Sequence, residues 1–254
     1  MDLSSSVTTR LEAAERQLAV FAREINQLYR DDRRNRAELE RATDELGEAQ
    51  LASVHTLVAA VEAWDPTTRA HLERTQRYAG ALIGVVDAAL AADRRLSYSF
   101  LLHDVGKLGI PAAILDKPGP LDPREWQVMH THPLLGVRIV AGMPFLGPAV
   151  DVIGCHHERW DGAGYPHGLR GAEIPLAARV FAVCDAFDAM TSDRSYRRAL
   201  PVERALDELR TGAGTQFDPT VVAAFMSELE RILALHASLQ HPAPAHVGSF
   251  AAGR

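Results

Sequence analysis

Seven residues of this chain are good ligands for a divalent transition metal, although they are spread over more than a hundred positions. They supply five imidazoles and two carboxylates: His71, His103, Asp104, His132, His156, His157 and Asp185. A catalytic ion usually takes three or four protein ligands and keeps one position open for water. The set is therefore larger than one ion needs, and it predicts two ions.

The sequence around these ligands makes the set more specific than a lone His-Asp pair. In chain order, the ligands after His71 lie in LLHDVGK at 101–107, HPLLG at 132–136, HHERWDGAGYPHGL at 156–169 and RVFAVCDAFDAMTSDR at 179–194. This ordered series resembles the HD-GYP subfamily of the HD phosphohydrolase superfamily, whose members are bacterial phosphodiesterases of cyclic di-GMP. The resemblance extends from about residue 50 to about residue 232.

The resemblance implies how the ligands are divided between two divalent ions. It assigns the first metal to His71, His103, Asp104 and Asp185. It assigns the second metal to His132, His156 and His157. Asp104 has two oxygens and is the natural bridge between the ions. The mixed nitrogen and oxygen set suits iron or manganese, which the subfamily resemblance favours, and zinc stays open.

Such a pair of ions shares a water, lowers its pKa and directs the resulting hydroxide at a phosphodiester. The resemblance implies hydrolysis of cyclic di-GMP to the linear dinucleotide pGpG, with further hydrolysis to GMP left open. Two alternatives remain. One is an HD-type phosphohydrolase of another nucleotide or cyclic dinucleotide, and the other is a non-catalytic sensor of cyclic di-GMP.

Four residues are predicted to contact the substrate. Lys107 lies three residues after Asp104, where its ammonium would stand beside the attacked phosphate, and both residues are predicted to be catalytic. Arg194 and Arg197 resemble a family pattern of arginines, and guanidinium groups bind phosphate oxygens bidentately. Tyr165, in the Gly-Tyr-Pro sequence, would stack on a guanine, with packing of its own loop as the alternative.

Two further residues lie close in sequence to the predicted ligands. Asp188 follows Asp185 by one helical turn and could touch the metal site or orient a ligand. His130 precedes His132 by two residues, so on a helix it is expected to face away from the metal.

Composition excludes several other classes of protein. The formal charge of −6 argues against binding of duplex DNA or RNA, which normally requires a basic face. No apolar run approaches the length of a membrane span, and the polar start is no signal peptide, so a cytoplasmic location is expected. The two cysteines, Cys155 and Cys184, fit a reducing compartment and are expected to be buried.

Residues 1–50 are predicted to form a coiled-coil helix that pairs two chains in parallel. An a/d seam is formed by Leu11, Ala14, Leu18, Phe21, Ile25, Leu28, Leu39, Ala42, Leu46 and Ala49. Asp32 and Asn35 interrupt this seam, and a lone amphipathic helix folded back on the domain is the alternative. Whether a regulatory partner protein acts on the helix stays open.

Residues 51–235 are predicted to form an all-α, HD-superfamily helical bundle, followed by a disordered tail at 236–254. Asp122-Pro123 and Asp218-Pro219 each look like an N-cap followed by proline at the first helical position. Helical periodicity continues through 221–235. The long, glycine-rich loop at 160–175 contains the Gly-Tyr-Pro sequence and is predicted to be functional.

Overall fold

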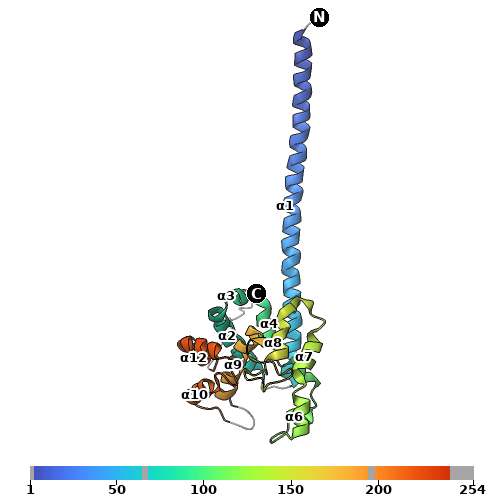
Figure 1. Cartoon of the computed structure of the whole chain (residues 1–254). Helices are drawn as coiled ribbons and strands as arrows, with labels where there is room; N and C mark the ends of the chain where they lie inside the picture. The colour runs from blue at the N-terminus through green and yellow to red at the C-terminus, as the bar shows by residue number, and fades with distance from the viewer. Residues whose placement is uncertain (1–2, 65–67, 194–197, 241–254) are drawn as a thin grey trace, which may run out of the picture. The chain divides into compact units, whose positions relative to one another are not determined.

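The computed structural model is all-helical, as predicted, and describes residues 3–64, 68–193 and 198–240. In these ranges the β structure is limited to an isolated bridge between Ala213 and Phe217. The α-helices, labelled in part in Figure 1, are α1 (Leu3–Trp64), α2 (Thr68–Val86), α3 (Ala88–Ala91), α4 (Arg94–Leu102), α5 (Ala112–Leu115), α6 (Pro123–Met129), α7 (His132–Val140), α8 (Val150–Cys155), α9 (Leu176–Thr191), α10 (Val202–Gly212), α11 (Pro219–Ser227) and α12 (Leu229–Gln240). The 3-10 helices are η1 (Val105–Gly109), η2 (Pro144–Ala149) and η3 (Gly171–Glu173).

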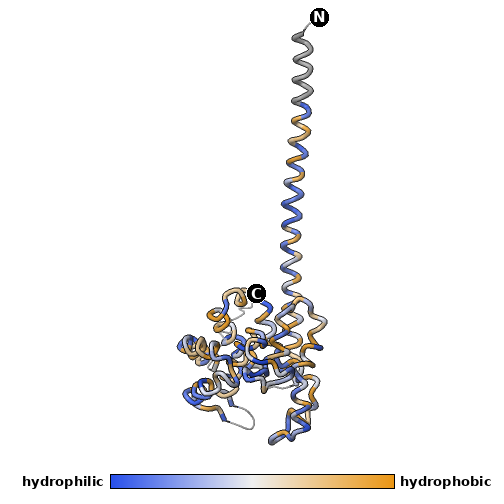
Figure 2. The backbone as a smooth tube through the Cα atoms, in the orientation of Figure 1, coloured by the Kyte–Doolittle hydropathy of each residue, from blue (hydrophilic) through white to orange (hydrophobic). Residues whose placement is uncertain are grey.

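The chain divides into two compact units, Met1–Ser53 and Val54–Arg254. The first unit consists of most of α1, and from residue 16 on hydrophobic residues are scattered among hydrophilic ones along it (Figure 2). Apolar side chains at the predicted seam positions are exposed on this single helix: Leu18, Phe21, Ile25, Leu28, Leu39 and Leu46. Within the described ranges, no helix combines the length and apolar character needed to cross a membrane.

The last turns of α1 belong to the second unit. Val54, Val58 and Val61 are spaced by four and three residues, so they lie on one face of the helix, and all three are buried. They pack in one cluster with Leu72 of α2 and Leu102 of α4. The end of α1 is therefore part of the core of the globular unit.

Helix α9 lies at the centre of the globular unit, where it packs against α2, α8, α10 and α11. Its buried residues include Val180, Phe181, Val183, Cys184 and Phe187. A helix that is apolar on most of its faces has to be enclosed by other elements. Because α9 carries Asp185 and Asp188, this packing holds two carboxylates inside the fold. Both cysteines are buried and free, as expected.

The two predicted helix starts are confirmed. The Asp122 side chain accepts hydrogen bonds from the Arg124 and Glu125 amides, and the Glu125 side chain accepts one from the Asp122 amide. This reciprocal pair is a capping box. Asp218 accepts a hydrogen bond from the Thr220 amide at the start of α11.

The C-terminal boundary differs from the prediction. The helical pattern at 221–235 is broken at Glu228 into α11 and α12, and α12 continues to Gln240. The expectation that the tail begins at residue 236 was therefore wrong by five residues. Leu235 and Leu239 pack against the core, and His236 hydrogen-bonds to the buried Tyr78 hydroxyl at 2.9 Å. Residues 241–254 lie outside the described ranges.

Candidate metal centre

The seven predicted ligands lie at helix ends and within two helices, α2 and α9. His71 is on α2 and Asp185 on α9, whereas the other five stand where a helix begins or ends. His103 and Asp104 follow α4, His132 begins α7, and His156 and His157 follow α8. Five helices therefore contribute donors, and the donor atoms meet only because these helices pack together.

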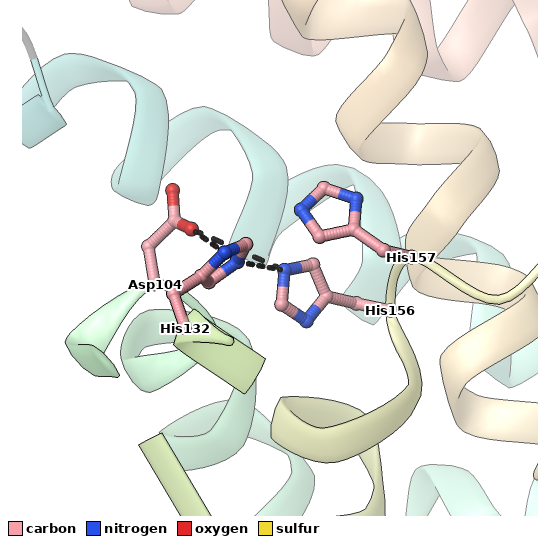
Figure 3. Close-up of side chains that lie close together, drawn as sticks. All are labelled: Asp104, His132, His156 and His157. Atoms are coloured by element: carbon pink, nitrogen blue, oxygen red, sulfur yellow. Dashed lines mark hydrogen bonds and ion pairs between the residues drawn. The ribbon is translucent and has the colours of Figure 1, made fainter. Parts of the chain in front are cut away.

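The donors form two groups that share Asp104. In the first group, one donor atom each from His71, His103 and Asp104 lies within 4.8 Å of the others. The second group, drawn in Figure 3, meets the same limit and consists of Asp104, His132, His156 and His157. Asp185 adjoins the first group, because its Oδ1 lies 3.2 Å from His71 Nε2. The structure thus brings all seven residues together in the predicted division.

The two oxygens of Asp104 face different groups. Oδ2 lies 3.3 Å from His103 Nε2, whereas Oδ1 lies 3.4 Å from His132 Nε2 and 3.9 Å from His156 Nε2. Oδ1 is also buried without a hydrogen-bond partner among the described residues. A buried carboxylate oxygen normally has a donor or a cation beside it. This geometry suits a carboxylate that bridges two cations.

Four histidines are held by the ring nitrogen that faces away from the cluster. His103 Nδ1 lies 2.8 Å from the Phe100 carbonyl oxygen, and His156 Nδ1 lies 3.0 Å from that of Ile153. In the same way, Nδ1 of His132 lies 2.8 Å from the Met129 carbonyl oxygen, and Nδ1 of His71 lies 2.8 Å from Asp188 Oδ2. These oxygens can only accept, so each Nδ1 carries the proton. Nε2 of each ring is then the nitrogen that faces the cluster.

The charge states of the second group also fit a cation. Burial lowers the pKa of His132 and His156, and it lowers the pKa of His157 to about 3. Burial opposes the charge of Asp104, yet Lys107 and His103 outweigh it and keep the pKa of this carboxyl well below its usual range. Nε2 of His132 and Nε2 of His156 are 3.3 Å apart (Figure 3), so two lone pairs point at one another. A cation between them removes this repulsion.

His71 is positioned by a buried ionic network. Arg74 Nε donates to Asp188 Oδ1 at 2.5 Å, and Arg74 Nη2 donates to Asp188 Oδ2 at 2.9 Å and to Ser192 Oγ at 2.8 Å. Burial lowers the pKa of His71, but the hydrogen bonds and charges of Asp185 and Asp188 outweigh it and raise this pKa to about 9. Asp188 thus orients a ligand, one of the two predicted roles. Arg74, which the sequence did not single out, holds Asp188 in place.

Gly106 permits the close approach of η1 and α7. A Cβ atom at this position would lie 1.8 Å from the His132 carbonyl oxygen and 2.5 Å from the Gly136 amide nitrogen. Only glycine fits such a contact between two backbones. The contact brings Asp104, at the start of η1, next to His132, at the start of α7.

The Gly-Tyr-Pro loop is fixed to the backbone that carries the last two histidines. Glu158 is buried and accepts hydrogen bonds from the His167 amide at 2.7 Å and the Leu169 amide at 3.0 Å. A Cβ atom at Gly164 would lie 2.6 Å from Glu158 Cα, so this glycine is required for the loop to pack there. Two hydrogen bonds from its amides to one buried carboxylate hold the loop beside the site.

Tyr165 lies between two histidine rings. Its ring centroid is 4.8 Å from that of His157 and 3.8 Å from that of His130, and both pairs are stacked. The expectation that His130 faces away from the metal site was wrong, because His130 and His132 do not share a helix. His130 caps the end of α6, and Pro133, in the first turn of α7, is the sequence signal that a new helix begins.

A family model described as HD domain matches residues 55–221. The chain belongs to the HD domain family. The match contains all seven predicted ligands, and the family resemblance seen in the motifs is confirmed. The two groups of donors are consistent with the metal site of an HD domain.

Several curated relatives of this HD domain protein are phosphodiesterases by name. The 3'3'-cGAMP-specific phosphodiesterase 2 of Vibrio cholerae is 36% identical over 197 residues, which cover 77% of this chain and 38% of the relative. A cyclic di-GMP phosphodiesterase of Thermotoga maritima is 39% identical over 164 residues, which cover 64% of this chain and 45% of the relative. The chain therefore spans less than half the length of these relatives.

A solved structure supports the fold. The crystal structure of a cyclic GMP-AMP specific phosphodiesterase of V. cholerae superimposes with a TM-score of 0.51 at 18% identity. The superposition covers 68% of this chain and 46% of that chain. The HD-like helical bundle is thus shared with a known protein despite low sequence identity.

The HD domain has a cavity of about 620 Å³ beside the donors. His156, His157 and Asp185 contribute to its wall, and so do Arg159 and Tyr165. Cavities of this size hold small-molecule ligands. The donor atoms therefore adjoin a space in which a substrate can lie.

The four residues predicted to contact the substrate differ in their position relative to the donors and the cavity. Lys107 Nζ donates to Asp104 Oδ2 at 2.6 Å, so its ammonium stands beside the first group of donors. Tyr165 lines the cavity, but rings cover both of its faces. Arg194 and Arg197 lie outside the described residues.

Proposed function

We propose that this HD domain is a metal-dependent phosphodiesterase that hydrolyses cyclic di-GMP to pGpG, with GMP as the product of a second hydrolysis. The observation that carries the proposal is the shared carboxylate of Asp104, whose two oxygens face separate groups of imidazoles beside a cavity. Relatives named as cyclic di-GMP phosphodiesterases support the choice of substrate.

The proposal includes two ions, iron or manganese, held as the motifs predict. The first ion would be held by His71, His103, Asp104 and Asp185. The second would be held by Asp104, His132, His156 and His157. Such a pair supplies an activated water and neutralises the charge of the phosphodiester.

The chain's own residues bind and orient the substrate. Lys107, whose Nζ is 2.6 Å from Asp104 Oδ2, places an ammonium where a phosphate oxygen would approach the ions. Arg194 and Arg197 would bind the second phosphate, because each guanidinium offers paired donors to an anion. The buried Asp188 and the three carbonyl oxygens behind the imidazoles keep the ligand rings from turning.

A second candidate substrate is 3'3'-cGAMP, because relatives of similar identity are named for it. The two dinucleotides share the ring of two phosphodiesters and differ in one base. The metal groups would serve both, so discrimination would come from the cavity wall. A non-catalytic sensor is the third candidate, and it has no chemical need for seven donors around a shared carboxylate.

The deciding experiment combines metal analysis with turnover. The protein would be purified without oxygen, its iron, manganese and zinc content measured, and its hydrolysis of cyclic di-GMP, 3'3'-cGAMP and pGpG compared. We expect two ions per chain and fastest turnover of cyclic di-GMP. Faster turnover of 3'3'-cGAMP would replace the proposed substrate, and tight binding without hydrolysis by the metal-loaded protein would support the sensor.

We also propose that two copies pair through α1. The exposed apolar residues of the unit Met1–Ser53 follow a seven-residue spacing, which a second identical helix would cover. The pairing concerns the long helix alone and requires no change in the metal site.

A further inference from the structure

His157 differs from the other imidazoles of the cluster. His71, His103, His132 and His156 are each held by a hydrogen bond to Nδ1, whereas the ring of His157 has no hydrogen bond to a described residue. A ligand ring without such a bond can rotate unless packing prevents it. The contacts of the His157 ring therefore decide whether its donor nitrogen stays aimed at the second group.

The face of the His157 ring is covered by Tyr165. The two centroids are 4.8 Å apart and the ring planes meet at 28°, which is an offset stack. The backbone reinforces this pairing, since the Tyr165 amide donates to the His157 carbonyl oxygen at 3.2 Å. Tyr165 is therefore held beside His157 by both its main chain and its ring.

His130 closes the other side of Tyr165. Its ring lies 3.8 Å from that of Tyr165, with an angle of 17° between the planes. His130 and His157 make no ring contact with each other in the described part of the chain, so they lie on opposite faces of the tyrosine. His130 is itself fixed by its position at the end of α6, where its amide donates to the Trp126 carbonyl oxygen at 2.9 Å.

We propose that Tyr165, clamped by His130, is a positioning residue that holds the His157 ring toward the second metal. This inference rests on the proposed function, because it assumes a metal in the second group. It gives His130 a role that no ligand motif predicts. It also leaves the tyrosine no open face on which a guanine could stack.

The test uses manganese as the probe and the full-length, metal-free protein. Mn²⁺ would be titrated by calorimetry into the wild type and into His130→Ala, Tyr165→Leu and Tyr165→Phe. His167→Ala is the matched control, since this exposed histidine is in the same loop and its amide bond to Glu158 survives the substitution. Circular dichroism would establish that each variant is folded.

We expect Tyr165→Phe and His167→Ala to bind two ions as the wild type does, because the phenyl ring preserves the stack. Tyr165→Leu and His130→Ala should weaken one of the two sites by about 10- to 100-fold, the usual effect of losing a group that orients a ligand. Excess Mn²⁺ should restore turnover in both weakened variants, since only metal occupancy is impaired.

Two intact sites in both His130→Ala and Tyr165→Leu would overturn the inference. So would a raised KM for cyclic di-GMP that excess Mn²⁺ does not correct, because that result would make Tyr165 a substrate contact. Failure of the proposed function looks different. It would appear in the wild-type protein. Fewer than two bound ions would overturn the inference as well. Full metal loading without hydrolysis would overturn the proposed function and leave the inference standing.

Discussion

Each oxygen of Asp104 faces a different group of imidazoles, so one carboxylate contributes a donor atom to both groups. A shared ligand makes the two sites interdependent, because removing it takes one donor from each. The histidines are less interdependent, since each belongs to one group. Substitution of Asp104 should therefore affect both metal sites, whereas substitution of a single histidine should affect one.

Asp104→Ala should lose both metals and all hydrolysis. The substitution removes the carboxylate that both groups share, and the second group is then left with imidazoles alone. Elemental analysis of the folded variant gives the metal content, and a cyclic di-GMP assay gives the activity. Full metal occupancy in the variant would disprove the bridging role.

Arg194→Ala combined with Arg197→Ala should weaken cyclic di-GMP binding and leave metal content unchanged. Arginine cannot ligate a cation, and each lost hydrogen bond between charged groups costs about 1.5–3 kcal/mol. Calorimetric titration and metal analysis on one preparation would measure both effects. Unchanged affinity would refute the phosphate role, and loss of metal would mean that the nearby helix α9 had been disturbed.

At the scale of elements, the site depends on how closely η1 and α7 approach. Gly106→Ala should destabilise the fold by about 1–3 kcal/mol, the usual cost of overpacking, because its Cβ would overlap the His132 carbonyl oxygen. It should also weaken the second metal site by moving Asp104 away from His132.

Gly80→Ala is the matched control for that substitution. Gly80 lies within α2 and has no atom within 4 Å of its hypothetical Cβ, so alanine should stabilise the helix by about 0.5–1 kcal/mol. Thermal unfolding of the two variants compares these opposite effects. Equal stability of Gly106→Ala and the wild type would show that η1 and α7 can separate without cost.

The residues that form the candidate site could be predicted from the sequence, whereas most of the residues that hold them in place could not. Six of the seven predicted ligands, all those after His71, could be proposed because each lies in a motif, and Asp122 and Asp218 could be recognised as helix caps from local chemistry alone. Arg74 and Glu158 could not, since their roles depend on contacts with Asp188 and with the loop amides at 167 and 169. Such contacts arise from packing between helices, which local patterns do not specify.

Across the whole molecule, α1 serves two units. Its first part presents exposed apolar residues, whereas Val54, Val58 and Val61 complete the core of the second unit. A boundary at residue 53 therefore falls inside a continuous helix.

Deletion of residues 1–53 should give a monomeric, folded, metal-binding protein, whereas deletion of residues 1–64 should unfold it. The longer deletion removes three buried valines, and each contributes about 1.5–3 kcal/mol by its burial. Light scattering of the full-length and shorter chains tests the dimer, and thermal unfolding tests the core. A full-length chain that is monomeric at micromolar concentration would contradict pairing through α1.

Three of the imidazoles are anchored to a carbonyl oxygen only three residues earlier in the chain. These hydrogen bonds at the helix ends fix the orientation of the three rings before any ion binds. A pocket whose donors hold their direction can release one divalent ion and accept another without refolding. First-row ions then compete by intrinsic affinity and by abundance. We therefore expect the ion found in the protein to follow the metal supply of the cell.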